Sequence, residues 1–286
     1  MQLEKRIKLC SFLTPVELQI ASHILSHKDE IVSMSVKEFS DEFYVSKSAI
    51  HRFCKKIGLT GFNDLKFSIS QDLAEYGKRD AELINVNYPF RKNDSSKKIA
   101  LQLSELYEVT IRDTFDYIDF TVLCDIIALL HDAKVIDIYT HSHNLNAAEN
   151  FQDKMLTIGR IVNVPKSFYK QRMNILASDS SHAAIILSYS GQATFILPVI
   201  KMLYEKRIPV IMICKAGGNH YPQYVDKVLE ISDKENLRDR ISQFSSHIAV
   251  QYMLDILYGC IYNADRDRNI EYLKNGIYFM DDRPIE

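Results

Sequence analysis

The sequence predicts two domains of different classes, an all-α domain followed by an α/β domain with a doubly wound parallel sheet. In the first 78 residues the apolar positions recur at helical spacing, whereas beyond residue 98 short apolar runs alternate with helical stretches. The length of 286 residues is sufficient for two hydrophobic cores. We therefore predict an N-terminal domain, a linker, a second domain and a C-terminal tail, at residues 1–78, 79–98, 99–264 and 265–286.

The N-terminal domain contains three predicted helix starts. Two of them have the residues of a capping box, in which a hydroxyl side chain and a glutamate three positions later bind each other's backbone N–H groups: Thr14 with Glu17, and Ser35 with Glu38. Pro15 suits the first position of the first helix. Ser46 is a third candidate N-cap, and Gly58 is expected to end the helix that follows it.

The helix predicted after Ser46 has one apolar and one polar face. Its inward-facing residues are Ile50, Phe53, Cys54 and Ile57. Spacings of three and four residues bring together the side chains of the other face, namely Lys47, Ser48, His51, Arg52, Lys55 and Lys56. A short helix, a tight turn and a second helix with such a face are typical of a helix-turn-helix, whose second helix enters the major groove of double-stranded DNA.

These side chains have the chemistry that DNA recognition requires. Arg52 can donate two hydrogen bonds to guanine, and Ser48 and His51 can read other base edges. The other cations suit phosphate groups, which supply affinity but little sequence preference: Lys55, Lys56 and Lys66. The alternative is that the polar side chains form the solvated face of a small helical bundle.

The distribution of charge favours the DNA hypothesis. The whole chain has 35 Lys and Arg against 37 Asp and Glu, a formal net charge of −2, which by itself argues against binding to nucleic acid. Residues 47–66, however, contain five basic residues and one acidic residue, whereas residues 81–286 have a net charge of −3. The positive charge is therefore concentrated in and just after the second helix of the motif.

The second domain is expected to follow a polar, proline-containing linker. Its predicted strands are residues 135–139, 161–164, 183–187, 210–214 and 228–231. They alternate with predicted helices at residues 99–117, 120–130, 144–158 and 193–205, and a long final helix is predicted at 237–262. Such alternation favours a five-stranded parallel sheet covered by helices on both faces, of the flavodoxin-like kind.

Ligands of such sheets bind where the strands end at their carboxyl termini. The stretch 188–192 follows the third predicted strand, and its hydroxyls, glycine and backbone N–H groups can hold a phosphate without a basic residue. The loop 140–144 after the first strand opens at the same edge. We therefore expect a ligand site, which the family resemblance described next makes an effector site, formed by Thr140, His141, Ser142, Asn144, Ser188, Ser190, Gly191 and Gln192.

Residues 45–66, V-S-K-S-A-I-H-R-F-C-K-K-I-G-L-T-G-F-N-D-L-K, resemble the signature of the RpiR family of bacterial transcriptional regulators. The S-x-S-G pattern at Ser188, and the stretches 154–159, 245–249 and 255–257, are similar to the sugar isomerase (SIS) domain of that family. The resemblance covers residues 5–262. It implies a homodimer or homotetramer that binds a DNA operator, senses a phosphorylated sugar effector through the SIS domain and regulates genes of carbohydrate metabolism.

One loop departs from the family pattern. After the first strand the family usually has G-x-G-x-S, whose glycines let the sugar phosphate approach the backbone closely. Here Thr140, Ser142 and Asn144 replace the two glycines and the serine. Either the effector differs from the usual one, or the SIS domain has lost effector binding and serves only to form the oligomer.

We expect a regulator that is not an enzyme and needs no cofactor or metal. The sequence lacks the G-x-S-x-G and G-x-x-x-x-G-K-[ST] motifs, and the pairs His141–His143 and His23–His27 lack the further ligands of a zinc site. A sugar-phosphate isomerase is the alternative function, because SIS relatives include such enzymes. Glu149 would then be the candidate acid or base, although an ion pair on the helix surface is its simpler role.

Composition indicates a cytoplasmic protein without a membrane partner. The longest apolar runs have about five residues, far fewer than a bilayer requires. Charges lie where a signal peptide would be apolar. The five cysteines are scattered and form no CxxC pair, as expected of reduced thiols.

Overall fold

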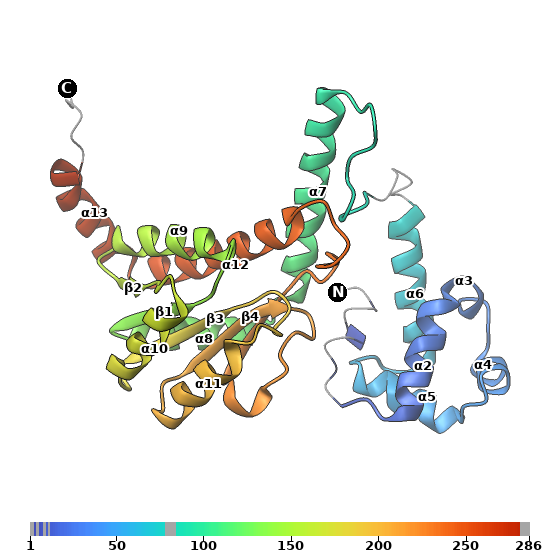
Figure 1. The fold of residues 1–286 in the computed structure, drawn as a ribbon. Coiled ribbons are helices and arrows are strands. Elements are labelled where there is room, and N and C mark those ends of the chain that lie inside the picture. The colour runs from blue at the N-terminus through green and yellow to red at the C-terminus, as the bar shows by residue number, and fades with distance from the viewer. Residues whose placement is uncertain (1–2, 4–5, 8–9, 11, 78–83, 281–286) are drawn as a thin grey trace. The chain divides into compact units, whose positions relative to one another are not determined.

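The computed structural model describes residues 3, 6–7, 10, 12–77 and 84–280. The chain forms two compact units, Met1–Asn85 and Val86–Glu286, each with its own hydrophobic core (Figure 1). The predicted succession of an all-α and an α/β domain is confirmed. Part of the expected linker, residues 79–83, lies outside the described residues, and the division between the units at Asn85 falls within that linker.

The first unit is built from helices around one core. Its described helices are α2 (Pro15–Ser26), α3 (Lys28–Ile31), α4 (Val36–Glu42), α5 (Lys47–Lys56) and α6 (Phe62–Gly77). Both predicted capping boxes are present, since Thr14 and Ser35 each bind the glutamate three residues later. The core of this unit includes fully buried Ile24, Phe53 and Leu65, from α2, α5 and α6.

A tight turn at residues 43–46 joins α4 to α5. Tyr44 in this turn has a φ of 53°, and its side chain is 92% exposed. Bulky residues rarely take this left-handed conformation. Ser46 then caps α5, because its Oγ accepts a hydrogen bond of 3.2 Å from the N–H of Ala49. The turn positions α5 with its polar face exposed.

The second unit contains five parallel strands in the order β2-β1-β3-β4-β5, which is the flavodoxin-like order. The strands are β1 (Val135–Tyr139), β2 (Ile161–Asn163), β3 (His182–Leu187), β4 (Val210–Lys215) and β5 (Lys227–Ile231). Every strand therefore lies within one residue of its predicted ends, which confirms the predicted five-stranded sheet.

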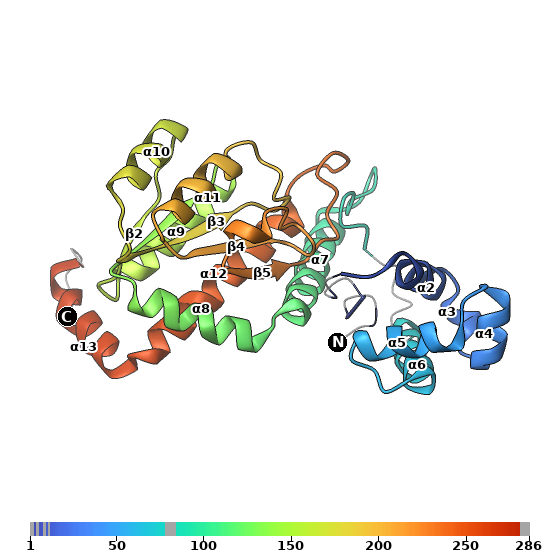
Figure 2. The ribbon, with the colours of Figure 1, turned by 90° about the horizontal axis from the view of Figure 1, so that it is seen from below.

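Helices cover both faces of the sheet (Figure 2). One face carries α8 (Phe120–Asp132), α9 (Asn144–Leu156) and α12 (Phe244–Ala264), with α7 (Ser96–Tyr117) against α12; the other carries α10 (Phe168–Ala177) and α11 (Ile196–Glu205). In β3, Ile185 packs with the first set and Ile186 with the second. Both faces are apolar, as expected for a covered parallel sheet.

One buried carboxylate interrupts this apolar interior. Asp137 in β1 is fully buried and accepts hydrogen bonds of 2.8 Å from Asn163 Nδ2 in β2 and 3.0 Å from Ser178 Oγ. Its Oδ2 also lies 2.8 Å from Nδ1 of His182 in β3. The carboxylate is thus hydrogen-bonded to both strands that flank β1, as a buried charge requires.

Several helix boundaries differ from the prediction, and the helix predicted at residues 99–117 begins at Ser96. The final helix of the sheet domain was expected from Leu237 but begins at Phe244, because the preceding loop binds another segment: the N–H of Ile241 donates to the carbonyl of Asn87 at 3.1 Å. The helix expected from Ala193 begins at Ile196. Within the predicted tail, residues Arg266–Met280 form α13.

In the part of the chain that the structure describes, no helix is both long enough and apolar enough to cross a membrane.

Candidate nucleic-acid interface and ligand site

The polar face of α5 is exposed along its whole length. All six predicted DNA-contact residues, Lys47, Ser48, His51, Arg52, Lys55 and Lys56, are exposed. The predicted inward residues Ile50, Phe53, Cys54 and Ile57 are buried in the core of the first unit. The core contacts therefore hold α5 in place through one face and leave the other free for contact with a partner.

Four of these six side chains are available for a partner. Lys47, His51, Arg52 and Lys55 make no hydrogen bond or ion pair with any residue that the structure describes, while the Ser48 hydroxyl lies 3.1 Å from that of Ser46. A cluster of cationic and polar groups without internal partners, on one helix face, is the arrangement that phosphate and base contacts require.

Lys56 differs from these four, because it is bound within its own unit. Its Nζ donates hydrogen bonds to Glu17 Oε2 at 2.8 Å and to the carbonyl of Phe12 at 2.5 Å. The bond from Lys56, together with the N–H of Thr14, lowers the pKa of Glu17 to about 2. Lys66 also has an internal acceptor, the carbonyl of Met34 at 2.9 Å.

The two loops of the expected effector site lie side by side at the carboxyl edge of the sheet. Tyr139 pairs with Ile186 in the register of β1 and β3, so loops 140–144 and 188–192 leave neighbouring strands. The hydroxyl of Thr140 donates a 2.8 Å hydrogen bond to the carbonyl of Leu187, and Thr140 is fully buried. Thr140 therefore joins the two strand ends and does not face solvent.

The other predicted effector residues divide by exposure. His141, Ser142 and Gln192 are exposed and Ser190 is half-buried, whereas Asn144, Ser188 and Gly191 are buried. Ser142 has a φ of 58°, in the left-handed region, where the family usually has a glycine. The loop therefore keeps a backbone conformation that favours glycine although a side chain is present.

Gly191 is needed for a different reason from the one expected. Its φ is 66°, and a Cβ at this position would lie 1.7 Å from the carbonyl oxygen of Gly218. Its N–H donates to the carbonyl of Ser188 at 3.2 Å, and the N–H of Gln192 donates to Ser190 Oγ at 3.2 Å. The glycine thus allows close packing on the loop after β4, and both N–H groups have internal acceptors.

A buried network next to these loops was missed by the sequence analysis. The carboxylate of Glu235 accepts hydrogen bonds from the N–H and Oγ of Ser246, at 2.9 and 2.6 Å, and pairs with Arg240. The hydroxyl of Tyr189, in the loop after β3, accepts from the N–H of Glu235 at 3.2 Å. Ser246 lies in the stretch 245–249 that resembles the SIS domain, but its contact with Glu235 and Arg240 could not be read from the sequence, because the fold brings these residues together from separate segments.

Basic groups surround His143 at this edge. Its pKa is lowered, first by burial and then by the nearby charges of Arg240, His247 and His141. An anion bound among these groups would be attracted to them and would favour the protonated imidazole. The sequence analysis assigned His141 to this site but not His143, Arg240 or His247.

Other candidate chemistry has little support. Glu149, the candidate acid or base, forms an ion pair with Lys166. His23 and His27 pack against Phe43, with the His23 ring stacked at 4.4 Å between centroids. Among the described residues, no three His, Cys, Asp or Glu side chains are grouped as a metal ion would require.

Comparison with known proteins identifies both units. Residues 1–76 match the family model described as the helix-turn-helix domain of the rpiR family, and residues 129–254 match that of the SIS domain. An uncharacterized HTH-type transcriptional regulator of Haemophilus influenzae is 25% identical over 265 residues, covering 93% of this chain and 91% of the relative. The uncharacterized regulator YbbH of Bacillus subtilis is 26% identical over 250 residues, covering 86% and 85%.

Solved structures agree on the fold. The Vibrio vulnificus NanR protein complexed with ManNAc-6P has a TM-score of 0.60 at 14% identity and covers 99% of this chain and 100% of its own. The sugar isomerase domain of an RpiR transcription factor from Sphaerobacter thermophilus has a TM-score of 0.55 at 10% identity, covering 62% and 97%. The chain belongs to the RpiR family of helix-turn-helix transcriptional regulators, with a SIS domain after its helix-turn-helix domain.

Proposed function

We propose that this regulator binds an operator in double-stranded DNA through α5 and responds to a phosphorylated sugar bound at the carboxyl edge of the SIS sheet. The observation that carries the first part is the exposed face of α5, where Lys47, His51, Arg52 and Lys55 have no partner among the described residues. Arg52 is assigned to a guanine, and Ser48 and His51 to other base edges. Lys47 and Lys55 are assigned to phosphates.

The effector site is proposed between loops 140–144 and 188–192. Ser190 and Ser142 offer hydroxyls there, and the imidazoles of His141, His143 and His247 and the guanidinium of Arg240, which is paired with Glu235, can offer N–H donors to a phosphate. The related NanR protein was solved in complex with ManNAc-6P, which supports a sugar phosphate as the effector class. Thr140 and Gly191 act in this proposal by shaping the loops, because neither faces an open site.

Regulation requires that the effector prefer one arrangement of the protein. We propose a homodimer or homotetramer whose helix-turn-helix domains bind two half-sites of an approximately palindromic operator. The effector changes operator affinity only to the extent that it binds one arrangement more tightly than the other. The proposed role is regulation of carbohydrate genes in the cytoplasm, without catalysis, and Glu149 is assigned to a surface ion pair with Lys166.

Operator binding is tested with the DNA flanking the chain's own gene. Wild-type protein should prefer this DNA to a scrambled duplex, with affinity falling as salt rises. Arg52→Ala should weaken binding and relax the preference at one base pair, at a cost of about 1–3 kcal/mol. Arg112→Ala, which removes an exposed arginine from α7, is the matched control. A wild-type protein without sequence preference would refute the proposal.

The effector is tested by thermal denaturation with a panel of sugar phosphates, beginning with N-acetylmannosamine 6-phosphate. A ligand that binds the native state raises its melting temperature. Ser190→Ala should reduce the shift in melting temperature. An unchanged shift would show that the ligand does not bind at loop 188–192. Turnover of a ketose or aldose phosphate would instead favour the isomerase alternative.

A further inference from the structure

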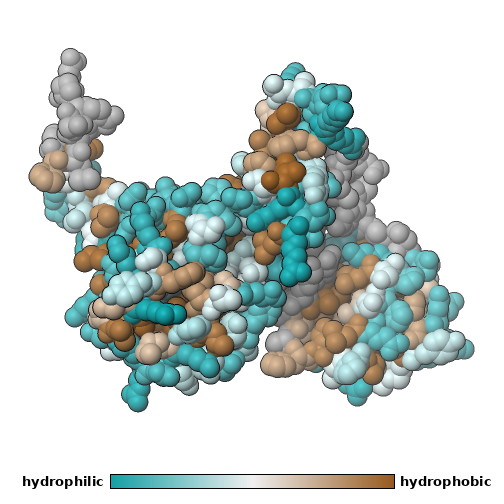
Figure 3. Space-filling model, viewed as in Figure 1, coloured by the Kyte–Doolittle hydropathy of each residue, from teal (hydrophilic) through white to brown (hydrophobic). Residues whose placement is uncertain are grey.

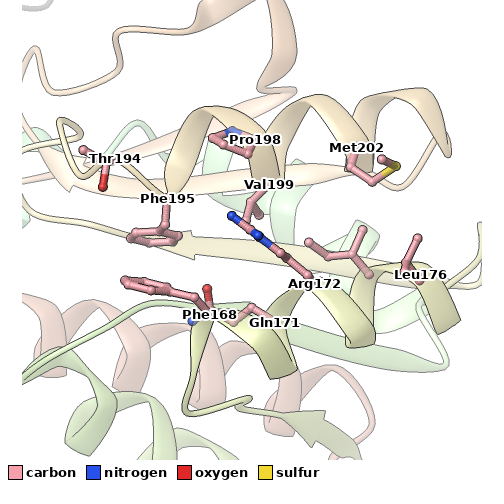
Figure 4. A pocket seen from close by; sticks show the side chains of 10 residues that line it. Phe168, Gln171, Arg172, Leu176, Thr194, Phe195, Pro198, Val199 and Met202 are labelled. Carbon is pink, nitrogen blue, oxygen red and sulfur yellow. The ribbon is translucent and has the colours of Figure 1, made fainter.

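A groove of about 540 Å³ lies between α10 and α11, on the sheet face opposite α9 (Figure 4). This volume is typical of a small-molecule site. Its walls are largely apolar and include Phe168, Ile175, Phe195, Val199 and Met202. Apolar side chains also gather on the surface over these two helices (Figure 3), where Phe168, Leu176 and Met202 are exposed.

One wall of the groove carries a buried hydrogen-bond acceptor without a donor. Gln171 is 1% exposed, and its Nε2 donates to the carbonyls of Thr140 at 2.5 Å and Pro165 at 3.3 Å. Two carbonyl acceptors fix the orientation of the amide, because the opposite orientation would face oxygen toward oxygen. Oε1 therefore points to the groove (Figure 4), and it has no hydrogen-bond partner among the described residues. A ligand needs an N–H or O–H group at this point.

Arg172 places a positive charge at the groove. Its side chain is exposed and makes no hydrogen bond or ion pair with any residue that the structure describes. Figure 4 shows the guanidinium reaching over the groove from α10 toward α11. No acidic side chain lines the groove. The one charge over apolar walls is therefore positive, which selects an anion.

We propose that this groove binds a small organic anion with an apolar body and an N–H or O–H donor. The anionic group pairs with Arg172, the donor binds Gln171 Oε1 and the apolar body lies along Ile175 and Val199. This site is separate from the proposed sugar-phosphate site and uses different residues.

The groove is connected to loop 140–144 by two contacts. Gln171 holds the carbonyl of Thr140 through Nε2, and the ring of His141 packs against Phe195 and Phe168, with centroids 5.1 and 6.2 Å apart. The two phenyl rings are themselves stacked at 5.9 Å. A ligand that moves Gln171 or the phenyl rings therefore acts on the loop that borders the sugar-phosphate site.

The proposal is tested by titration calorimetry of the full chain with three probes that share an octanoyl chain. N-octanoylglycine has the apolar body, an amide N–H and a carboxylate; N-octanoylsarcosine lacks the N–H, and N-octanoylglycinamide lacks the charge. We expect one N-octanoylglycine per chain, and about tenfold weaker binding of each of the other two, because each leaves one polar group of the groove unpaired.

Variants then assign the binding to the groove. Arg172→Met should weaken the binding of N-octanoylglycine about tenfold and leave the affinity for N-octanoylglycinamide unchanged. Lys201→Met, which removes an exposed cation of α11 outside the groove lining, should bind like wild type. Met202→Trp at the exposed rim should fill the groove and weaken the binding of all three probes. A thermal melt of each variant confirms that it is folded.

Two results would overturn the proposal. One is binding of N-octanoylglycine that neither Arg172→Met nor Met202→Trp weakens. The other is absence of N-octanoylglycine binding to the wild-type chain; a change of oligomeric state in Met202→Trp, measured by sedimentation, would then assign the groove to an interface between two copies. All arms use octanoyl probes, so failure of the sugar-phosphate hypothesis leaves this test intact.

Discussion

The ammonium nitrogen of Lys56 in α5 lies 2.8 Å from Oε2 of Glu17 in α2, so one cation of the proposed DNA-reading helix serves the fold of its own domain. The same carboxylate accepts the N–H of Thr14 at 2.8 Å and completes the cap of α2. A single glutamate thus ties α2 to the helix that we assign to the major groove.

This geometry predicts a loss of stability in acid. The hydrogen bonds from Lys56 and Thr14 lower the pKa of Glu17 from 4.5 to about 2, so the stability it contributes is complete above pH 4.5 and is lost as the pH falls toward 2. Glu17→Gln keeps a cap acceptor but removes the charge, and should flatten this part of the curve of unfolding free energy against pH. Urea unfolding at several pH values measures this free energy for wild type and variant. Glu42→Gln, on the exposed end of α4, should follow wild type.

Lys55 and Lys56 are expected to act differently although they are adjacent. Lys55→Met should lower operator affinity and reduce the slope of log affinity against log salt by about 0.9, the loss of one phosphate contact. Lys56→Met should leave the slope unchanged and lower the stability of the first unit, since its partner is Glu17. Equal slopes for the two variants would contradict this assignment. Fluorescence anisotropy over a salt series provides the data.

Replacing Tyr44 by glycine should stabilise the first unit by about 1 kcal/mol. Its φ of 53° is costly for a bulky side chain and its exposed ring gains little from packing. Asn93→Gly is the control, because Asn93 has a φ of 70° but asparagine tolerates this region. A Tyr44→Gly variant that is stable but binds DNA more weakly would indicate that the ring contacts the operator.

Gly191→Ala should destabilise the SIS domain by several kcal/mol, roughly the upper range for a buried backbone clash. The added methyl would overlap the carbonyl oxygen of Gly218, at 1.7 Å. Gly259→Ala makes the same chemical change in α12, where nothing lies within 4 Å of the new atom, and should be neutral or slightly stabilising. Thermal unfolding compares the two; similar melting temperatures would contradict the packing of the loops.

Effector affinity should rise as the pH falls through the lowered pKa of His143. Burial and nearby cations keep the free imidazole neutral, whereas a bound anion favours its protonated form, so binding takes up a proton. The affinity of wild type relative to His143→Gln should therefore increase on going from pH 8 toward pH 5. The ratio removes the titration of the phosphate itself. A constant ratio would place the anion away from His143.

The sequence was most informative where local rules decide the structure. The capping boxes at Thr14 and Ser35, the cap at Ser46 and the alternation of buried strands depend on residues close in the chain, and the structure has them as predicted. The predicted start of α12 at Leu237 was wrong because the N–H of Ile241 binds the carbonyl of Asn87, more than 150 residues earlier. No local pattern reports such a contact.

The loops of the proposed effector site also depend on contacts that are distant in the sequence and could not be predicted from it. Ser190 and His141 could be chosen from the pattern, but the burial of Thr140 and the contact between Gly191 and Gly218 depend on neighbouring strands. The network of Glu235 with Arg240 and Ser246 joins a loop to the start of a helix and could not be foreseen from spacing. Sequence reasoning located the edge of the sheet but not the chemistry of each position.

The carboxylate of Asp137 gives the sheet a reference point that its apolar residues cannot provide. In β3, alternate residues enter two cores that are both apolar, so a shift of the strand by one position would exchange one set of aliphatic side chains for another. Hydrophobicity alone discriminates weakly against that misalignment. Only the correct register places Asn163 and His182 on either side of the buried carboxylate. Asp137 therefore specifies how the three strands align.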